Sequence, residues 1–164
     1  MGMPVDPQEF RTAMARFPGA VTIITARVPE ERRGITATAV CSVSAEPPSL
    51  LVCVNRGTGT GAAIHETGRF NVNLLADPAD ELALRFAGAR GVTGEEKFAA
   101  GDWGEDDRGL PVLRGALLSL SCDVTDTLEA GSHTVFVGCI TQIHQGEGAP
   151  LMYERSRFHR LQPI

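Results

Sequence analysis

Two stretches late in the chain alternate between apolar and polar side chains, and this alternation limits the possible folds more than any other feature. The first covers residues 118–125 and reads LSLSCDVT, and the second continues the habit over residues 135–143. Successive side chains of a strand point to opposite faces, so a period of two predicts a half-buried strand. Such strands are typical of antiparallel sheets. We therefore expect an antiparallel pair joined by a turn at Glu129-Ala130-Gly131.

Runs rich in β-branched residues predict more strands in the first half of the chain. These runs cover residues 21–25, 35–43, 50–54 and 70–75. Residues 29–34 are interpreted as the turn between the first two strands, and Pro47-Pro48 as the end of the second. The continuous apolar run at residues 50–54 predicts a strand buried on both faces.

Three short helices are expected beside these strands. Asp6 can cap a helix that starts at Pro7, and Glu9 completes a capping-box spacing. The apolar positions of this first helix follow helical spacing and predict core packing: Phe10, Ala13, Met14 and Phe17. A second helix is expected over residues 62–66, and residues 77–80 repeat the helix-start chemistry. The apolar stripe of that third helix is Ala79, Leu82, Ala83 and Phe86.

Residues 88–109 form a long segment rich in Gly, Asp and Glu, without hydrophobic periodicity. Connections of this length are uncommon in a compact domain unless they are functional. We interpret the segment as an excursion that forms a lid.

Six or seven strands with few helices predict a mainly β protein, a barrel or sandwich with peripheral α-helices, and not a βαβ fold. No G-x-G-x-x-G sequence follows a strand, and the spacing in Gly57-Thr58-Gly59-Thr60-Gly61 differs from that of a dinucleotide-binding loop. With 164 residues, the chain fits one domain over residues 1–164.

Charge and composition exclude several classes of partner. A net charge of −5 argues against binding to nucleic acid, which requires a basic face. No apolar run is long enough to cross a membrane, and no leader pattern precedes residue 10, so we expect a cytoplasmic protein without membrane contact. The four cysteines are far apart and are interpreted as buried free thiols. The histidines lack ligand spacing, so we expect no metal site.

Two segments could bind a ligand on their residue types alone. The Gly-Thr-Gly-Thr-Gly stretch precedes a predicted helix and could offer hydroxyl and N–H groups to an anion, although a plain flexible loop is equally consistent. The small residues from Gly34 to Val40 could let a flat ligand approach the backbone, or could instead permit close packing against a helix.

The chain resembles the flavin reductases of two-component monooxygenase systems, which have an FMN-binding split-barrel fold of Greek-key type. The resemblance covers residues 10–161 and depends on the order and spacing of several short motifs. These motifs are FR-x-AM at 10–14, GAVTI at 19–23, GITA at 34–37, SVS-x-x-PP at 42–48, T-x-T-x-x-x-I at 58–64, F-x-VN-x-L at 70–75, KF at 97–98, GLPVL at 109–113, His133, and PL-x-Y at 150–153.

The resemblance implies which residues contact each cofactor. The flavin ring is expected on Thr36, Ala37, Thr38, Ala39, Val40, Ser42 and Val43. The ribityl phosphate is expected on Asn55, Arg56, Thr58 and Thr60, with Lys97 and Phe98 closing over the flavin. The nicotinamide dinucleotide is expected at His133, Tyr153, Glu154, Arg155 and Ser156.

Three motifs depart from the family pattern at four residues. Thr38 and Ala39 replace an Asn-Ser pair in the expected flavin wall, Thr58 replaces a serine, and Ser132 replaces an aspartate beside His133. These changes affect flavin preference and dinucleotide affinity and not the class of reaction.

The resemblance implies an NAD(P)H:flavin oxidoreductase. It would pass a hydride from NADH, or from NADPH in its place, to FAD or FMN, and would supply the reduced flavin to a separate flavin-dependent monooxygenase. The cofactors carry such chemistry, so no catalytic acid or base is expected. The resemblance also implies a homodimer in which subunits complete each other's sites. The alternative is a split-barrel protein that binds flavin or haem without turnover.

Overall fold

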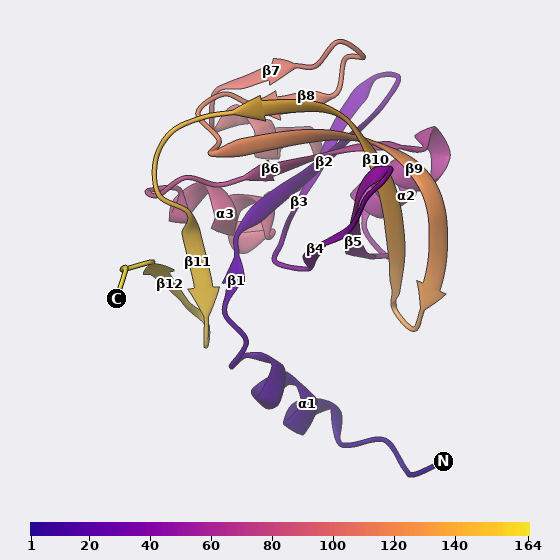
Figure 1. Cartoon of the computed structure of the whole chain (residues 1–164), viewed down its shortest axis with the longest axis vertical. Helices are drawn as coiled ribbons and strands as arrows, with labels where there is room; N and C mark the ends of the chain where they lie inside the picture. Colours follow the sequence, from indigo (N-terminus) through magenta and orange to yellow (C-terminus); the bar gives the residue numbers. More distant parts are fainter.

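A seven-stranded antiparallel sheet runs through the computed structural model, which describes residues 1–164 (Figure 1). Its strands lie in the order β3-β2-β6-β9-β10-β5-β4. They are β2 (Thr22–Val28), β3 (Glu31–Ala37), β4 (Val40–Ala45), β5 (Pro48–Asn55), β6 (Arg69–Leu74), β9 (Leu118–Ala130) and β10 (His133–Gln145). The two edge strands, β3 and β4, follow each other in the chain but are not paired with each other. The result is an open, split barrel, which confirms the expected fold class.

Two smaller sheets complete the β structure. One contains β1 (Gly19–Ala20), β11 (Leu151–Glu154) and β12 (Arg157–Arg160), and the other contains β7 (Trp103–Glu105) and β8 (Pro111–Leu113). The helices are α1 (Pro7–Met14), α2 (Gly59–Thr67) and α3 (Asp80–Phe86), followed by the 3₁₀ helices η1 (Ala89–Gly91) and η2 (Gly94–Ala99).

The predicted strand at residues 35–43 is two strands, and the predicted turn at residues 29–34 is mostly strand. The β2–β3 hairpin turns at Pro29-Glu30, and the chain then leaves the sheet at Thr38 and Ala39 before β4 begins. Pro48, expected after the end of a strand, instead opens β5. The apolar run at residues 50–54 is buried on alternate residues and not on both faces.

Both faces of the central sheet are covered by apolar clusters. Ile24 on β2 belongs to a core that α2 closes with Ala63 and Ile64. Ile23, next along the same strand, belongs to a second core that includes Phe86 of α3. Neighbouring residues of β2 therefore serve opposite cores, as strand geometry requires.

The first part of the polar face of β9 is buried as well, which the alternation did not predict. Ser119 is 3% exposed and Ser121 is 2% exposed, because β8 and the turn before it cover this face. Asn73 on β6 joins the layers: its side-chain oxygen accepts hydrogen bonds from the Leu113 amide at 2.9 Å and the Ser119 hydroxyl at 3.0 Å. Hydrogen bonding of this kind offsets the cost of burying polar groups.

The turn before β8 is fixed by Asp106. Its carboxylate accepts hydrogen bonds at 2.9 Å from the Arg108 and Leu110 amides and from the Ser121 hydroxyl. Burial alone would raise the pKa of Asp106, but these hydrogen bonds outweigh burial and hold that pKa below its usual value.

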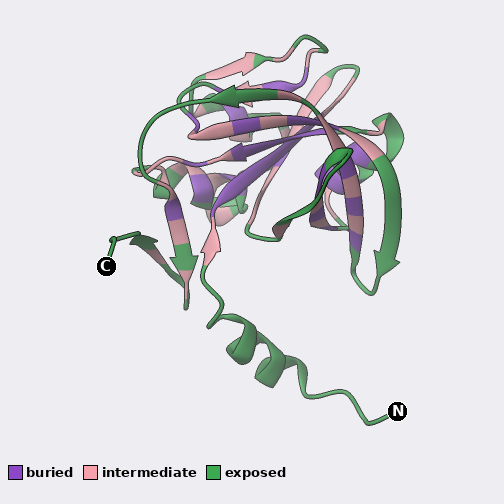
Figure 2. Ribbon diagram, in the orientation of Figure 1, coloured by how far each residue is buried: buried purple, intermediate pink, exposed green.

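Helix α1 contradicts the predicted core packing. Asp6 caps it as expected, accepting a hydrogen bond from the Gln8 amide at 2.7 Å. None of its residues is buried, however, and the helix extends away from the barrel (Figures 1 and 2). The apolar stripe is exposed because no other part of the chain reaches it, with Phe10 at 55% and Phe17 at 71% exposure.

The segment at residues 88–109 is folded onto the core, in contrast to the expected excursion. The ring of Phe98 meets Phe86 edge-on at 5.0 Å, and Trp103 packs against Phe98 at 4.9 Å. Arg32 of β3 holds the segment from outside, with its Nε 2.6 Å from a Glu95 carboxylate oxygen. These contacts anchor η2 beside β3.

Helix α3 and the cysteines also differ from expectation. Asp77 does not cap α3, which begins at Asp80, because its carboxylate accepts a hydrogen bond from Arg160 at 2.5 Å.

All four cysteines are free, but only Cys122 is buried, and burial raises its pKa to about 12. Cys41 is exposed. No helix of the chain is sufficiently long and apolar to span a bilayer.

Candidate flavin site at the barrel seam

Strands β3 and β4 are not paired with each other, and the opening between them, called the seam below, is lined by small residues. Thr36 and Ala37 at the end of β3 are half-buried, whereas Thr38 and Ala39 are exposed. The Thr36 hydroxyl donates to the Ala83 carbonyl of α3 at 2.6 Å. Packing against a helix is therefore observed on one side of the segment, and Thr38 and Ala39 are accessible at the seam. Ser42 and Val43 on β4 are exposed there too.

An apolar hollow of about 230 Å³ opens beside this seam. Tyr153 and Phe158 wall it from the β11–β12 hairpin, with ring centroids 5.1 Å apart. The other lining residues are Val21, Thr36, Ala37, Thr38, Ala83, Leu84 and Ala87. A flat apolar ring suits such a hollow.

A smaller polar hollow of about 80 Å³ lies nearer the start of β3, at the N-terminus of α2. It is lined by Arg33, Gly34, Ile35, Thr58, Gly59, Thr60, Gly94 and Lys97. Thr58 caps α2: its hydroxyl accepts from the Gly61 amide at 3.1 Å and donates to the Asn55 carbonyl at 2.7 Å. Helix N-termini favour anions because their free N–H groups and the helix dipole point at the ligand.

Thr60 is the donor that the protein itself leaves free. The residue is 3% exposed, it lines the polar hollow, and its hydroxyl makes no hydrogen bond within the chain. The Asn71 side-chain oxygen is the one fully buried polar side-chain atom without a hydrogen bond, so the Thr60 hydroxyl is open to the hollow. It can donate a hydrogen bond to an anion there.

Lys97 places a cation at the same hollow. Its ammonium group donates to the Gly34 carbonyl at 3.1 Å and the Phe86 carbonyl at 2.9 Å, and it has no carboxylate partner. Burial lowers the pKa of this ammonium group. The neighbouring Phe98 side chain is 5% exposed and faces the core, so only Lys97 of this pair borders the hollow.

Arg56 and Asn55 lie outside the polar hollow. The Arg56 guanidinium bonds to the Glu129 carboxylate at 2.9 Å and to the Gly131 carbonyl, and it borders a separate hollow beside α2. The Asn55 side chain accepts from the Gly57 amide at 2.8 Å. The guanidinium that does line the hollow is that of Arg33, which sequence reasoning placed in a turn.

The residues predicted for the dinucleotide lie in two separate places. His133 opens β10 opposite Asn55, and its Nδ1 is 2.9 Å from the Ser132 hydroxyl. Tyr153 and Glu154 belong to β11, and Arg155 and Ser156 form the tight turn to β12. Figure 1 shows the β9–β10 hairpin and the β11–β12 hairpin on opposite sides of the seam. One chain does not bring these two groups together.

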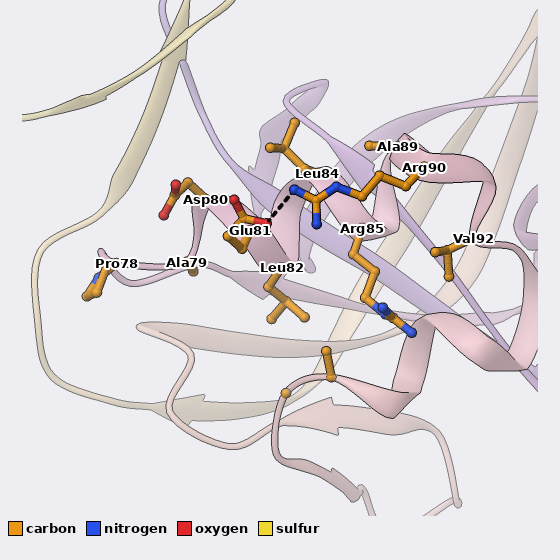
Figure 3. Close-up of a pocket in the computed structure, with 12 residues that line it drawn as sticks. Pro78, Ala79, Asp80, Glu81, Leu82, Leu84, Arg85, Ala89, Arg90 and Val92 are labelled. Atoms are coloured by element: carbon orange, nitrogen blue, oxygen red, sulfur yellow. Dashed lines mark ion pairs between the residues drawn. The ribbon is translucent and has the colours of Figure 1, made fainter.

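A larger hollow of about 550 Å³ lies elsewhere, between α3, η1 and residues 100–101 (Figure 3). Of its charged side chains, Arg85, Arg90 and Glu81 already have partners, and Asp80 has none. Arg85 donates to the Lys97 carbonyl at 2.9 Å, and Arg90 pairs with Glu81 at 3.5 Å on the surface. None of the predicted site residues lines it, whereas several line the two smaller hollows at the seam, which are the candidate site.

An apolar hollow and a cationic hollow along one strand define a class of protein that can hold a flat ring bearing a phosphorylated tail. From Gly34 to Ala37 the strand rises by roughly 10 Å, a length that a ribityl chain can span.

The chain belongs to the flavin reductase like domain family, whose model matches residues 14–162. It is 44% identical over 158 residues to the 4-hydroxyphenylacetate 3-monooxygenase reductase component of Pseudomonas aeruginosa, covering 94% of this chain and 92% of that protein. It is also 39% identical to the FMN reductase (NADH) RutF of Ancylobacter novellus, covering 94% of this chain and 85% of that protein.

Solved structures agree with this assignment. The NADH:FAD oxidoreductase SgcE6 of Streptomyces globisporus, in complex with NAD and FAD fragments, matches with a TM-score of 0.88 and 29% identity over 99% of this chain and 98% of that one. The flavin reductase PheA2 matches with a TM-score of 0.87 and 32% identity over 97% and 100% of the two chains. The family expected from the motifs is confirmed, and these relatives favour a reductase over a non-catalytic flavin- or haem-binding protein.

Proposed function

We propose that the chain is an NAD(P)H:flavin oxidoreductase that supplies reduced flavin to a separate flavin-dependent monooxygenase. The observation that carries the proposal is the pair of hollows along β3, one apolar and one cationic, at the seam of a flavin reductase-like barrel. The nicotinamide supplies a hydride from its C4, and the flavin, FMN or FAD, accepts it at N5.

The protein's task in this reaction is binding and alignment. The backbone from Thr36 to Val40, with Ser42 and Val43, is proposed to support the ring. The hydroxyl of Thr60 and the ammonium group of Lys97 are proposed to hold the phosphate, while Thr58, whose hydroxyl proton goes to the Asn55 carbonyl, is proposed to fix the start of α2 beside it. No acid or base is needed at the reacting atoms, because holding two flat rings in register supplies the main catalytic effect.

A homodimer would bring the two parts of the proposed dinucleotide site together. His133 and the Tyr153–Ser156 stretch are separated within one chain. In a dimer, one subunit would contribute His133 and the other would contribute the Tyr153–Ser156 stretch. The exposed stripe of α1, with Phe10 and Phe17, would then pack against the partner. The four free cysteines are in keeping with a reducing compartment, and we place the protein in the cytoplasm, away from membranes and nucleic acid.

The flavin is proposed to act as a substrate that leaves after each turnover. NADH oxidation, followed at the nicotinamide absorbance band, should then depend saturably on added FMN or FAD. Stoichiometric flavin that survives dialysis and turns over at the full rate without addition would reject this part of the proposal. Failure of FMN, FAD and riboflavin alike to support NADH or NADPH oxidation would reject the reductase itself.

Two matched tryptophan substitutions, each at an exposed alanine, test whether the flavin ring binds at the seam. Ala39→Trp places a large ring on the seam, and Ala62→Trp places the same ring on an exposed site of α2. Only the first should lower flavin-dependent turnover by tenfold or more, because it fills the space proposed for the ring. Equal effects of the two variants would move the site away from the seam.

A further inference from the structure

Arg33 holds its guanidinium at the mouth of the polar hollow. The side chain crosses the start of α2 so closely that a Cβ on Gly59 would lie 3.3 Å from its Cδ and Nε. On the other side, a Cβ on Gly94 would lie 3.4 Å from an Arg33 terminal nitrogen and 2.9 Å from the Glu31 carboxylate. Two glycines therefore make room for this arginine between α2 and η2.

Glu31 fixes the orientation of that guanidinium without using all of its donors. One terminal nitrogen of Arg33 bonds to the Glu31 carboxylate, two residues earlier on the same strand. A guanidinium carries five N–H groups in a planar fork, so the remaining groups stay available. The Arg33 side chain makes no other hydrogen bond in the chain, and it is only partly exposed.

The charges around the hollow leave it net positive. Arg33 and Lys97 contribute two cations, and Glu31 is the one carboxylate whose side chain meets them. The neighbouring Glu95 is committed to Arg32 through hydrogen bonds from its amide at 2.9 Å and its Nε at 2.6 Å. Thr60, a residue only 3% exposed, opens its hydroxyl to the same space and makes no side-chain hydrogen bond within the chain.

We infer that Arg33, and not Arg56, is the guanidinium that binds the flavin phosphate and makes this chain prefer phosphorylated flavins to riboflavin. This inference rests on the proposed function and names a specificity residue for it. Arg33 would approach the phosphate from β3 while Thr60 and the amides of α2 approach it from the helix. A guanidinium fork matches the oxygens of a phosphate better than a single ammonium group does.

The test compares affinities for FMN, FAD and riboflavin by fluorescence titration in wild type, Arg33→Met and Arg33→Lys. Methionine keeps a stem that packs on Gly59 and removes the charge. Losing a hydrogen bond to a charged group should raise the Kd for FMN or FAD in Arg33→Met by about 10- to 150-fold. Arg33→Lys should raise the Kd for FMN or FAD by a smaller factor, and the riboflavin affinity of both variants should stay within about twofold of the wild-type value. The more affected of FMN and FAD identifies which flavin places its phosphate there.

Two further arginine variants serve as controls. Arg27→Ala removes another ion-paired arginine of the same hairpin, bonded to Glu105, and should leave all three affinities unchanged. A loss that appears in Arg56→Ala and not in Arg33→Met would overturn the inference. Equal losses for riboflavin and the phosphorylated flavins would overturn it as well, as would a wild type without preference for phosphorylated flavin. Binding is measured without NADH, so a protein that binds flavin through Arg33 but fails to oxidise NADH would reject only the proposed function.

Discussion

Adding one methyl group at Gly34 should disturb the flavin site through the aromatic core behind it. A Cβ at this position would lie 2.5 Å from Cε1 and 2.8 Å from Cδ1 of Phe86, and 3.3 Å from Cζ of Phe98. The first distance is about 1 Å inside ordinary van der Waals contact, and both rings are packed in the second core. Gly34→Ala therefore has to displace β3 or the rings.

Overpacking of this kind costs about 1 to 3 kcal/mol, which corresponds to a melting temperature lower by roughly 2 to 12 °C in a chain of this size. Gly34 also offers its carbonyl to the Lys97 ammonium group, so a shift of β3 moves Lys97 and Arg33 relative to α2. FMN affinity should fall by tenfold or more.

Gly138→Ala is the matched control. Its Cβ would lie 2.7 Å from Cζ of Phe70 and 2.8 Å from Cβ of Cys122, within the first core and away from the two hollows. Thermal unfolding should show similar losses of stability for both variants, while an FMN titration below the transition should show a loss for Gly34→Ala only. Parallel losses of affinity in the two variants would refute the coupling between this glycine and the site.

Four further results are expected. Thr60→Ala should weaken FMN by about 10- to 150-fold and leave riboflavin nearly unchanged, with Thr60→Ser close to wild type; equal losses for both flavins would reject the phosphate contact. His133→Ala should raise the KM for NADH several-fold, about 1 kcal/mol, at unchanged flavin KM, whereas a collapse of kcat at unchanged NADH KM would indicate proton transfer. The pKa of Asp106 is held below its usual value, so the ionised carboxylate stabilises the fold above pH ~4, and this stabilisation is lost as the pH falls through the folded pKa. Asp106→Asn should therefore lower the free energy of unfolding at neutral pH and make that free energy less dependent on acid pH. An unfolding profile like that of the wild type would exclude this role. Replacing Phe10 and Phe17 together by serine should shift a dimer toward monomer in sedimentation experiments, and an unaltered dimer would place the interface away from α1.

Local patterns predicted most of the elements. The alternation at residues 118–125 and 135–143 marks β9 and β10, and Asp6 with Pro7 marks the start of α1, because these signals depend only on nearby residues. Alternation reports which side chains share a face and not what covers that face. Ser119 was therefore expected on the surface and lies under β8 instead.

In the candidate site, too, nearby residues were predicted from the sequence and contacts between distant segments were not. The family resemblance placed Thr58 and Thr60 at the flavin phosphate, and both border the polar hollow. The place of Arg33 at the same hollow was not foreseen, because the pair of arginines at residues 32–33 is typical of a polar turn and only the pairing of β3 with β2 turns Arg33 toward α2. The exposure of α1 was also unpredictable, since an apolar stripe does not reveal which surface it meets.

The aromatic cluster behind β3 gives the protein an optical reporter. Trp103 is the only tryptophan of the chain, and it packs 5.2 Å from Phe86, whose carbonyl accepts a hydrogen bond from Lys97. Flavins absorb in the range where tryptophan emits, so a flavin at the seam should quench this single emitter by energy transfer. Unlabelled protein can therefore report occupancy of the seam through its own ultraviolet fluorescence, with a signal that comes from one known position beside the pocket.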